Sequence, residues 1–126
     1  MKIIVLLFLL GKLLTVVQQP PGDLLFVSSG AWDVTQWQAA DQFGSTGLLA
    51  HNWGAGQYFN QLWIGQKVAV IYADGEVENF IVSDVIVYLP GFKDEDVIRD
   101  VYTGDYLVLQ TCLGDGRLFI RAKEAQ

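Results

Sequence analysis

Near its C-terminus the sequence reads Tyr106-Leu107-Val108-Leu109-Gln110-Thr111-Cys112, then Leu113-Gly114-Asp115-Gly116, then Arg117-Leu118-Phe119-Ile120-Arg121-Ala122. The two outer segments are rich in apolar, β-branched and aromatic residues, which suit a pleated and half-buried surface. The glycine-rich segment between them is typical of the turn of a β-hairpin. This stretch therefore predicts two antiparallel strands at 106–112 and 117–122, in which Cys112 faces Arg117 across the turn.

The sequence upstream continues this pattern of short strands and turns. Apolar segments at 24–27, 47–51, 67–73 and 77–89 predict further strands. Asp74-Gly75 predicts a type I′ hairpin turn, a helical turn is expected within 54–61, and a short helix is expected at 94–99. The 126 residues fit one domain, since domains commonly contain ~150 residues. These features predict an all-β fold, a single β-barrel with short helical turns and a compressed N-terminal part.

The first 22 residues differ in composition from the rest of the chain. Two apolar runs, at 3–10 and 13–17, are followed by Pro20-Pro21-Gly22, which is typical of a linker. The runs are short for a membrane-spanning helix of ~20 residues, but the first fits the apolar core of a signal peptide. We therefore expect a hydrophobic leader and linker at 1–22, as a signal or short membrane anchor, and a barrel domain at 23–126. The alternative is a buried strand or helix at the edge of the core.

Composition and charge exclude several classes of function. Hydrophobic residues make up 52% of the chain and charged residues 17%, which excludes an intrinsically disordered protein. The net charge of −6, without a cluster of lysine and arginine, argues against a nucleic-acid partner. One cysteine and one histidine allow neither an internal disulfide nor a histidine-rich site, so we expect no bound metal. Cys112 and His51 therefore have to be interpreted individually.

Three side chains can be combined into a cysteine-based active site. In the predicted hairpin the Cβ atoms of Cys112 and Arg117 lie roughly 5 Å apart, and a neighbouring cation increases the reactive thiolate fraction of a thiol. His51, at the end of another predicted strand, is placed to give a proton to a leaving amine. Each residue also has an ordinary interpretation, as a core cysteine, a packed histidine and a solvated hairpin arginine. Spacing alone leaves both interpretations open.

The local sequences around these residues resemble the signature of sortases. In that family an apolar strand ends in Thr-Cys and the next strand opens with Arg, as at Thr111-Cys112 and Arg117 here. Thr46-Gly47-Leu48-Leu49-Ala50-His51-Asn52 resembles the sortase histidine strand, residues 59–68 resemble the segment after it, and residues 30–34 resemble the early part of the sortase barrel. The resemblance spans about residues 24–123. It departs from the family pattern in the short connection after Cys112 and at Ala50, where sortases more often have Gly.

The resemblance implies a cysteine transpeptidase on an eight-stranded, sortase-like β-barrel that acts outside the cell membrane or is secreted. Cys112 would attack the carbonyl after the Thr of a sorting motif similar to Leu-Pro-x-Thr-Gly, and His51 would protonate the departing amine. Arg117 would hydrogen-bond the carbonyl oxygen as negative charge develops there. The neighbouring residues Thr111, Ala50 and Asn52 are the expected substrate contacts.

The implied partners are surface proteins with a sorting signal and an amine acceptor, either a cell-wall precursor or a pilin lysine. The N-terminal segment would add contact with the membrane. No cofactor is expected; the acidic run at 94–96 lies where some sortases bind calcium, but we interpret it as a solvated loop. The alternative to an enzyme is a non-catalytic β-barrel module of the cell surface. Such a module would bind peptide or glycan through a face built from the four Trp and five Tyr.

Overall fold

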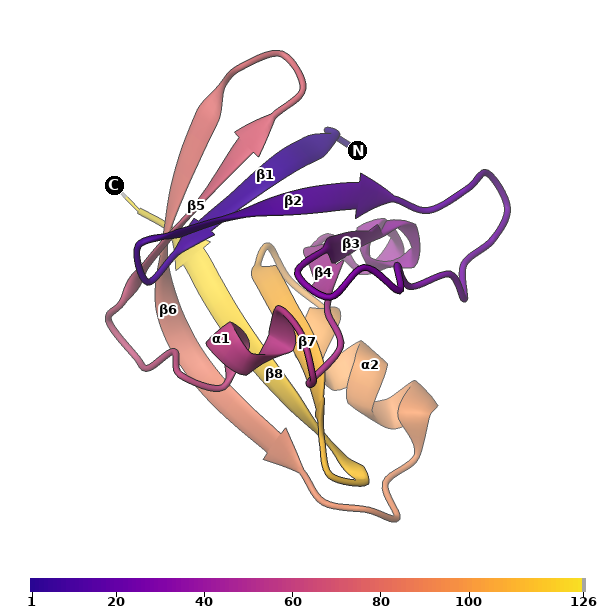
Figure 1. The fold of residues 1–126 in the computed structure, drawn as a ribbon. Helices are drawn as coiled ribbons and strands as arrows, with labels where there is room; N and C mark the ends of the chain where they lie inside the picture. The colour runs from indigo at the N-terminus through magenta and orange to yellow at the C-terminus, as the bar shows by residue number, and fades with distance from the viewer. Residues whose placement is uncertain (126) are drawn as a thin grey trace.

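A computed structural model describes residues 1–125, which form a closed barrel of eight strands (Figure 1). The strands are β1 (Ile4–Leu9), β2 (Lys12–Gln18), β3 (Val34–Trp37), β4 (Thr46–Leu49), β5 (Lys67–Tyr72), β6 (Val77–Tyr88), β7 (Leu107–Leu113) and β8 (Gly116–Glu124). Short helices lie in the connections: the 3-10 helix η1 (Gln38–Phe43), α1 (Gly56–Phe59) and α2 (Asp94–Tyr102). The predicted all-β barrel with short helical turns is confirmed. No helix in the described part of the chain is long and apolar enough to cross a membrane.

The order of the strands explains how distant segments meet. Around the barrel the order is β1-β2-β3-β4-β7-β8-β6-β5, and β1 pairs with β5 to close it. Most neighbours are antiparallel, but β2 and β3 are parallel, and so are β4 and β7, with Leu49 opposite Gln110. Parallel strands end at the same edge of a sheet. The residues that follow Leu49 therefore emerge beside the residues that follow Gln110.

Apolar side chains form two clusters, one on each side of the barrel wall. The interior cluster contains Leu7, Leu48, Leu109 and Ile120 among others, and each of these four is fully buried. The second cluster packs α2 and η1 against the outside of β7 and β8 and includes Val101, Tyr102, Val108 and Phe119. Because successive residues of a strand face opposite sides, Phe119 and Ile120 serve different clusters. Both faces of β7 and β8 are thereby covered.

The structure corrects the sequence-based prediction at the N-terminus. Residues 4–18, expected to belong to a leader at 1–22 ahead of the barrel, are its strands β1 and β2. Leu10 and Gly11 both have positive φ, 50° and 72°, as the type I′ turn of a hairpin requires. This turn sends the second apolar run back along the first, with Leu14 in the core and Lys12 in solvent. The barrel domain therefore includes residues 4–18, although their composition differs from that of the rest of the chain.

Three smaller differences concern loops and turns. The segment 24–27 is an irregular loop rather than a strand, whereas 34–37, not predicted as a strand, forms β3. The hairpin at Asp74-Gly75 is confirmed, but only Gly75 of this pair has positive φ, so the turn is not of type I′. The loop at 24–27 is held by the buried carboxamide of Gln19, whose Nε2 donates to the carbonyl oxygens of Leu24 and Phe26 at 3.1 and 3.0 Å.

Candidate active site

The parallel pairing of β4 and β7 brings His51 and Cys112 to one end of the barrel. Beyond the last strand pair, the backbone N–H of Ala50 donates to the carbonyl of Gln110 at 3.1 Å. The hydroxyl of Thr111 then donates to the carbonyl of Ala50 at 2.7 Å. Ala50 and Thr111 are both buried, so these two bonds tie the two strand ends together directly before the candidate histidine and cysteine.

Cys112 and Arg117 face each other across the β7–β8 hairpin. Their Cα atoms are partners in the register, as are those of Leu113 and Gly116, so the turn itself is Gly114-Asp115. Gly114 has a φ of 60°, the conformation that glycine provides at the first position of a type II′ turn. The predicted pairing is thus confirmed, with a turn two residues shorter than the four-residue connection we expected.

The two side chains of this pair are open to a ligand. Cys112 is a free, exposed cysteine. Arg117 is half-buried, with its guanidinium carbon 5.7 Å from the centre of the Phe92 ring. Within residues 1–125 no carboxylate forms an ion pair with Arg117. The donors of the guanidinium therefore remain available to a substrate carbonyl.

A glycine-containing turn positions His51. The N–H groups of Gly54 and Gly56 both donate to the carbonyl of His51, at 3.1 and 2.9 Å. A Cβ atom on Gly54 would overlap the carbonyl of Ala31, and one on Gly56 would overlap the hydroxyl of Thr111, so the turn requires glycine at both positions. The turn also places the ring of Trp53 on the imidazole of His51, with centroids 4.9 Å apart and planes 13° apart. Sequence analysis missed this contact of Trp53.

His51, Cys112 and Arg117 line one open pocket of about 450 Å³. Ala50 and Thr111 also line it, whereas Asn52 lies on a second pocket on which Cys112 also borders. Part of the pocket lining is apolar and consists of Leu24, Leu25 and Val27 from the irregular loop and Ile98 from α2. The sequence analysis did not predict this apolar wall. Leu25 is 92% exposed, although its side chain is apolar. Apolar residues in a loop outside any strand were the signal in the sequence that could have indicated a ligand-binding surface.

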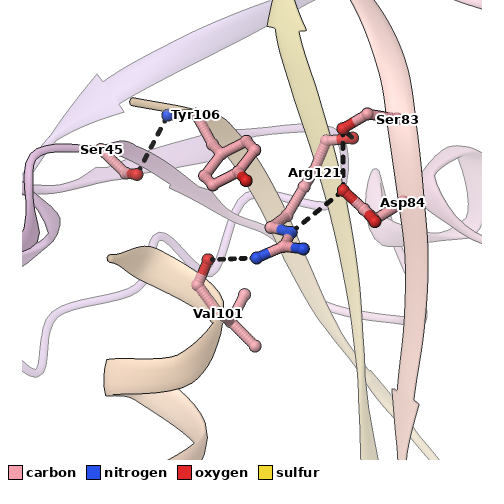
Figure 2. Close-up of polar contacts among 6 residues, drawn as sticks. All are labelled: Ser45, Ser83, Asp84, Val101, Tyr106 and Arg121. Atoms are coloured by element: carbon pink, nitrogen blue, oxygen red, sulfur yellow. Dashed lines mark hydrogen bonds and ion pairs between the residues drawn. The ribbon is translucent and has the colours of Figure 1, made fainter. Parts of the chain in front are cut away.

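Arg121, the other arginine of β8, is engaged elsewhere. Figure 2 shows its guanidinium between the Asp84 carboxylate, at 3.2 Å, and the carbonyl of Val101 near the end of α2, at 3.5 Å. The guanidinium carbon lies 4.4 Å from the centre of the Tyr106 ring. In the register Arg121 faces Val108, well before Cys112 on β7. Arg121 therefore connects α2 to the barrel and takes no part in the pocket.

The environment of Asp84 keeps its carboxyl ionised. Burial alone would raise the pKa of Asp84, but hydrogen bonds from Ser83 and Arg121, together with the charge of Arg121, lower it below the ordinary value. The Ser83 hydroxyl donates to the carboxylate at 2.8 Å. These contacts form an ion pair that is partly shielded from water, with side chains 18% and 36% exposed.

The acidic run at the start of α2 does not assemble a metal site. Asp96 forms an ion pair with Arg99 at 2.8 Å, and Asp94 lines the active-site pocket. Among the residues that the structure describes, no three His, Cys, Asp or Glu side chains are grouped to hold a metal ion. The ionisable side chains that line the pocket, within residues 1–125, are therefore those of Cys112, His51, Arg117 and Asp94.

Solved structures identify the fold of this closed barrel as that of the sortases. Sortase C from Clostridium perfringens matches with a TM-score of 0.71 and 15% identity over 98% of this chain. Sortase A from Corynebacterium diphtheriae matches with 0.74 and 13% over 100%, and sortase C1 from Streptococcus suis with 0.72 and 17% over 99%. The match covers 70%, 62% and 74% of those chains, respectively. No protein-family model and no curated protein matches the sequence.

Proposed function

We propose that this protein is a cysteine transpeptidase of the sortase kind. It cleaves a sorting signal similar to Leu-Pro-x-Thr-Gly and transfers the acyl part to an amine. The observation that carries the proposal is the exposed thiol of Cys112 opposite Arg117, on a pocket that His51 also lines. The sortase fold supports the same conclusion.

In the first half-reaction the thiolate of Cys112 attacks the carbonyl carbon after the Thr of the signal. The guanidinium of Arg117 stabilises the oxyanion by hydrogen bonds, since its donors are not used in an ion pair within the described chain. His51, as imidazolium, gives a proton to the departing amine. The C–N bond breaks, a thioester C–S bond forms, and the neutral amine leaves.

In the second half-reaction an amine nitrogen attacks the thioester carbonyl. A C–N bond forms, the C–S bond breaks, and the proton of the amine passes to His51. Water in place of the amine gives hydrolysis. The two half-reactions require no oxidant, metal or organic cofactor.

The apolar wall of the pocket supports a substrate with aliphatic residues before the reacting carbonyl. Leu24, Leu25, Val27 and Ile98 line the pocket together with the thiol. Full burial of an aliphatic side chain contributes about 1.5–3 kcal/mol, and contact with this open wall contributes a part of that. The Leu and Pro of the sorting motif have this chemistry. In this proposal the partners are surface proteins that carry such a signal, and the site of action is the outer face of the cell membrane or the extracellular space.

Mass spectrometry of a mixture with a Leu-Pro-Ala-Thr-Gly peptide and an amine tests the proposal. We expect an adduct on Cys112 with the mass of the acyl part, and a product in which the amine replaces Gly. A scrambled peptide of the same composition should give neither. A non-catalytic binding module would bind the peptide without forming the adduct, and that outcome would overturn the proposal.

A further inference from the structure

The loop at 28–33 connects the pocket-lining residues at 24–27 to strand β3 and has no part in the proposed mechanism. Within the described chain none of its own residues lines the active-site pocket. The ring of Trp32 lies 5.7 Å from the ring of Tyr58 in α1. The loop therefore packs against the segment that follows His51, on the side away from a bound substrate.

The carbonyl of Ala31 contacts the turn that carries His51. It accepts a hydrogen bond from the backbone N–H of Ala55 at 2.9 Å. The same carbonyl lies so close to Gly54 that a Cβ atom there would overlap it. Gly54 and Ala55 are both buried, and the N–H of Gly54 holds the carbonyl of His51 at 3.1 Å. The position of Ala31 thus fixes one side of the histidine turn.

The side chains of Ser28 and Asp33 determine where Ala31 lies. The Ser28 hydroxyl donates to the carboxylate of Asp33 at 2.8 Å and accepts from the N–H of Gly30 at 3.2 Å. The N–H of Asp33 donates to the carbonyl of Gly30 at 3.2 Å. Hydrogen bonds to a carboxylate are stronger than those between neutral groups. These bonds join the two ends of the loop and leave Ala31 at its apex.

The base of the loop is attached to the barrel. The backbone N–H of Ser28 donates to the hydroxyl of Thr35 at 2.9 Å, and Thr35 is fully buried in β3. Thr35 is the partner of Leu49 in β4, the strand that leads to His51. The loop is therefore fixed to the barrel at its base and to the histidine turn at its apex.

We propose that Ser28 and Asp33 are positioning residues for His51. Their hydrogen bond keeps the carbonyl of Ala31 against the turn, so that the imidazole stays stacked on Trp53 and directed at the pocket. This proposal rests on the proposed function, because the task that it serves is proton donation by His51. A displacement of about 1 Å at a reacting group can lower a rate by as much as ~100-fold.

Kinetics of Leu-Pro-Ala-Thr-Gly peptide cleavage by the full chain test this proposal. Asp33→Ala and Ser28→Ala should each lower kcat about ten-fold and change KM less than about two-fold, because the substrate keeps its contacts while the proton donor is misplaced. Asp33→Asn should retain most of kcat, since a carboxamide oxygen still accepts from the Ser28 hydroxyl. The double alanine variant should lose no more than either single variant, because the two side chains act through one hydrogen bond.

Asp74→Ala is the matched control for these variants. The Oδ1 atom of Asp74 accepts from the N–H of Glu76 at 2.9 Å, so this aspartate also orders a turn, but it lies between β5 and β6 and does not line the pocket. Asp74→Ala should leave kcat unchanged.

NMR spectroscopy follows the imidazole without catalysis, because His51 is the only histidine in the chain. The ring current of the stacked Trp53 displaces the imidazole C–H resonances upfield. In Asp33→Ala and Ser28→Ala these resonances should move toward the positions that they take in Trp53→Ala. Asp33→Asn and Asp74→Ala should leave them in place. A purely structural role would lower the unfolding temperature without moving these resonances in the folded variants, and that result would overturn the proposal.

Ser28→Ala removes a single hydroxyl and therefore decides the case even where Asp33→Ala does not fold. An unchanged kcat in Ser28→Ala, or a loss in Asp33→Asn as large as in Asp33→Ala, would contradict the positioning role. If the unmodified protein forms no acyl-enzyme, the proposed function fails, and the resonances of His51 still decide whether Ser28 and Asp33 position its ring.

Discussion

Cys112 and Arg117 are partners in the β7–β8 hairpin, one residue pair before its turn. Residues opposite each other on antiparallel strands project to the same face, with Cβ atoms roughly 5 Å apart. The relative position of thiol and guanidinium is therefore set by the backbone register and by the Gly114-Asp115 turn. Activity that depends on this pair should therefore be sensitive both to these two side chains and to the turn that fixes their register.

Cys112→Ala should abolish acyl-enzyme formation and peptide cleavage, because the nucleophile is removed. The side chain is exposed, so its loss leaves no cavity, and the unfolding free energy should change by less than about 0.5 kcal/mol. Peptide cleavage followed by chromatography and thermal unfolding of both proteins check the two expectations. Full cleavage by the variant would remove Cys112 from the mechanism.

The two arginines of β8 should behave differently. Arg117→Ala removes a charge-assisted donor from the pocket, and we expect kcat/KM to fall by about 100-fold or more, equivalent to roughly 3–4 kcal/mol. Arg117→Lys should restore part of the rate, because a lysine cannot reproduce the fork of donors. Arg121→Ala should change kcat/KM little but lower the unfolding temperature, because Arg121 connects Asp84 to α2. Equal kinetic losses in Arg117→Ala and Arg121→Ala would contradict the observed register.

Trp53→Ala should reduce turnover by about three- to ten-fold, because the stacked indole that positions His51 is lost, and such ring pairs contribute about 0.5–1.5 kcal/mol. Trp53→Phe should retain most of the rate. Trp63→Ala serves as the control, since Trp63 is also an exposed tryptophan but, unlike Trp53, does not stack on His51 in the described structure. The comparison uses kcat from progress curves of peptide cleavage. Identical kcat values for the two alanine variants would show that the stacking has no role in turnover.

Asp84→Asn should destabilise the protein in a pH-dependent manner. The pKa of Asp84 is lower in the folded chain than its ordinary value, so the ionised carboxylate stabilises the fold at neutral pH. We expect the variant to be about 1 kcal/mol less stable at pH 7, a modest value because the ion pair is partly exposed. The difference should shrink as the pH falls from about 4 through the lowered pKa. Urea unfolding between pH 7 and pH 2 measures it, with Asp100→Asn, an exposed residue of α2, as the control.

Two adjacent leucines of β2 distinguish a barrel strand from a leader. Leu14 is 6% exposed and Leu13 is 57% exposed. Leu14→Ala should lower the unfolding free energy by about 2–5 kcal/mol, as expected for a core leucine, and Leu13→Ala by no more than about 0.5 kcal/mol. Denaturant unfolding of the two variants gives both values. A segment outside the barrel would show no difference between them.

The C-terminal hairpin could be predicted because its determinants are local. The glycines of the turn and the strand-forming residues on either side lie within one short stretch, and the pairing of Cys112 with Arg117 follows from their positions beside the turn. The proximity of His51 to Cys112 has a different origin. It depends on the parallel pairing of β4 with β7, two segments separated by nearly half of the chain, which no local pattern encodes. From the sequence alone, His51 could be combined with Cys112 only as a residue at another strand end, and the resemblance to sortases then favoured that combination.

The N-terminal strands could not be recognised from periodicity, for a physical reason. Phe8 and Leu13 are apolar but face solvent, 45% and 57% exposed, and they stand opposite each other in the β1–β2 hairpin. Apolar residues on the outer face hide the alternation that identifies a half-buried strand. The loop at 24–27 was predicted as a strand because its residues are apolar. These residues line a pocket and do not belong to a sheet.

The closure of the barrel by β1 and β5 has a consequence for the order in which the chain can fold. Ile4 pairs with Tyr72, so β1 takes its second neighbour from a strand that lies about half of the described chain further on. Pairings between such distant segments slow folding, because the entropy of the intervening chain must be overcome first. Until β5 arrives, β1 presents a free edge, a template for association with other chains. Chains in which β1 and β5 have not yet paired are thus the ones exposed to association at this edge.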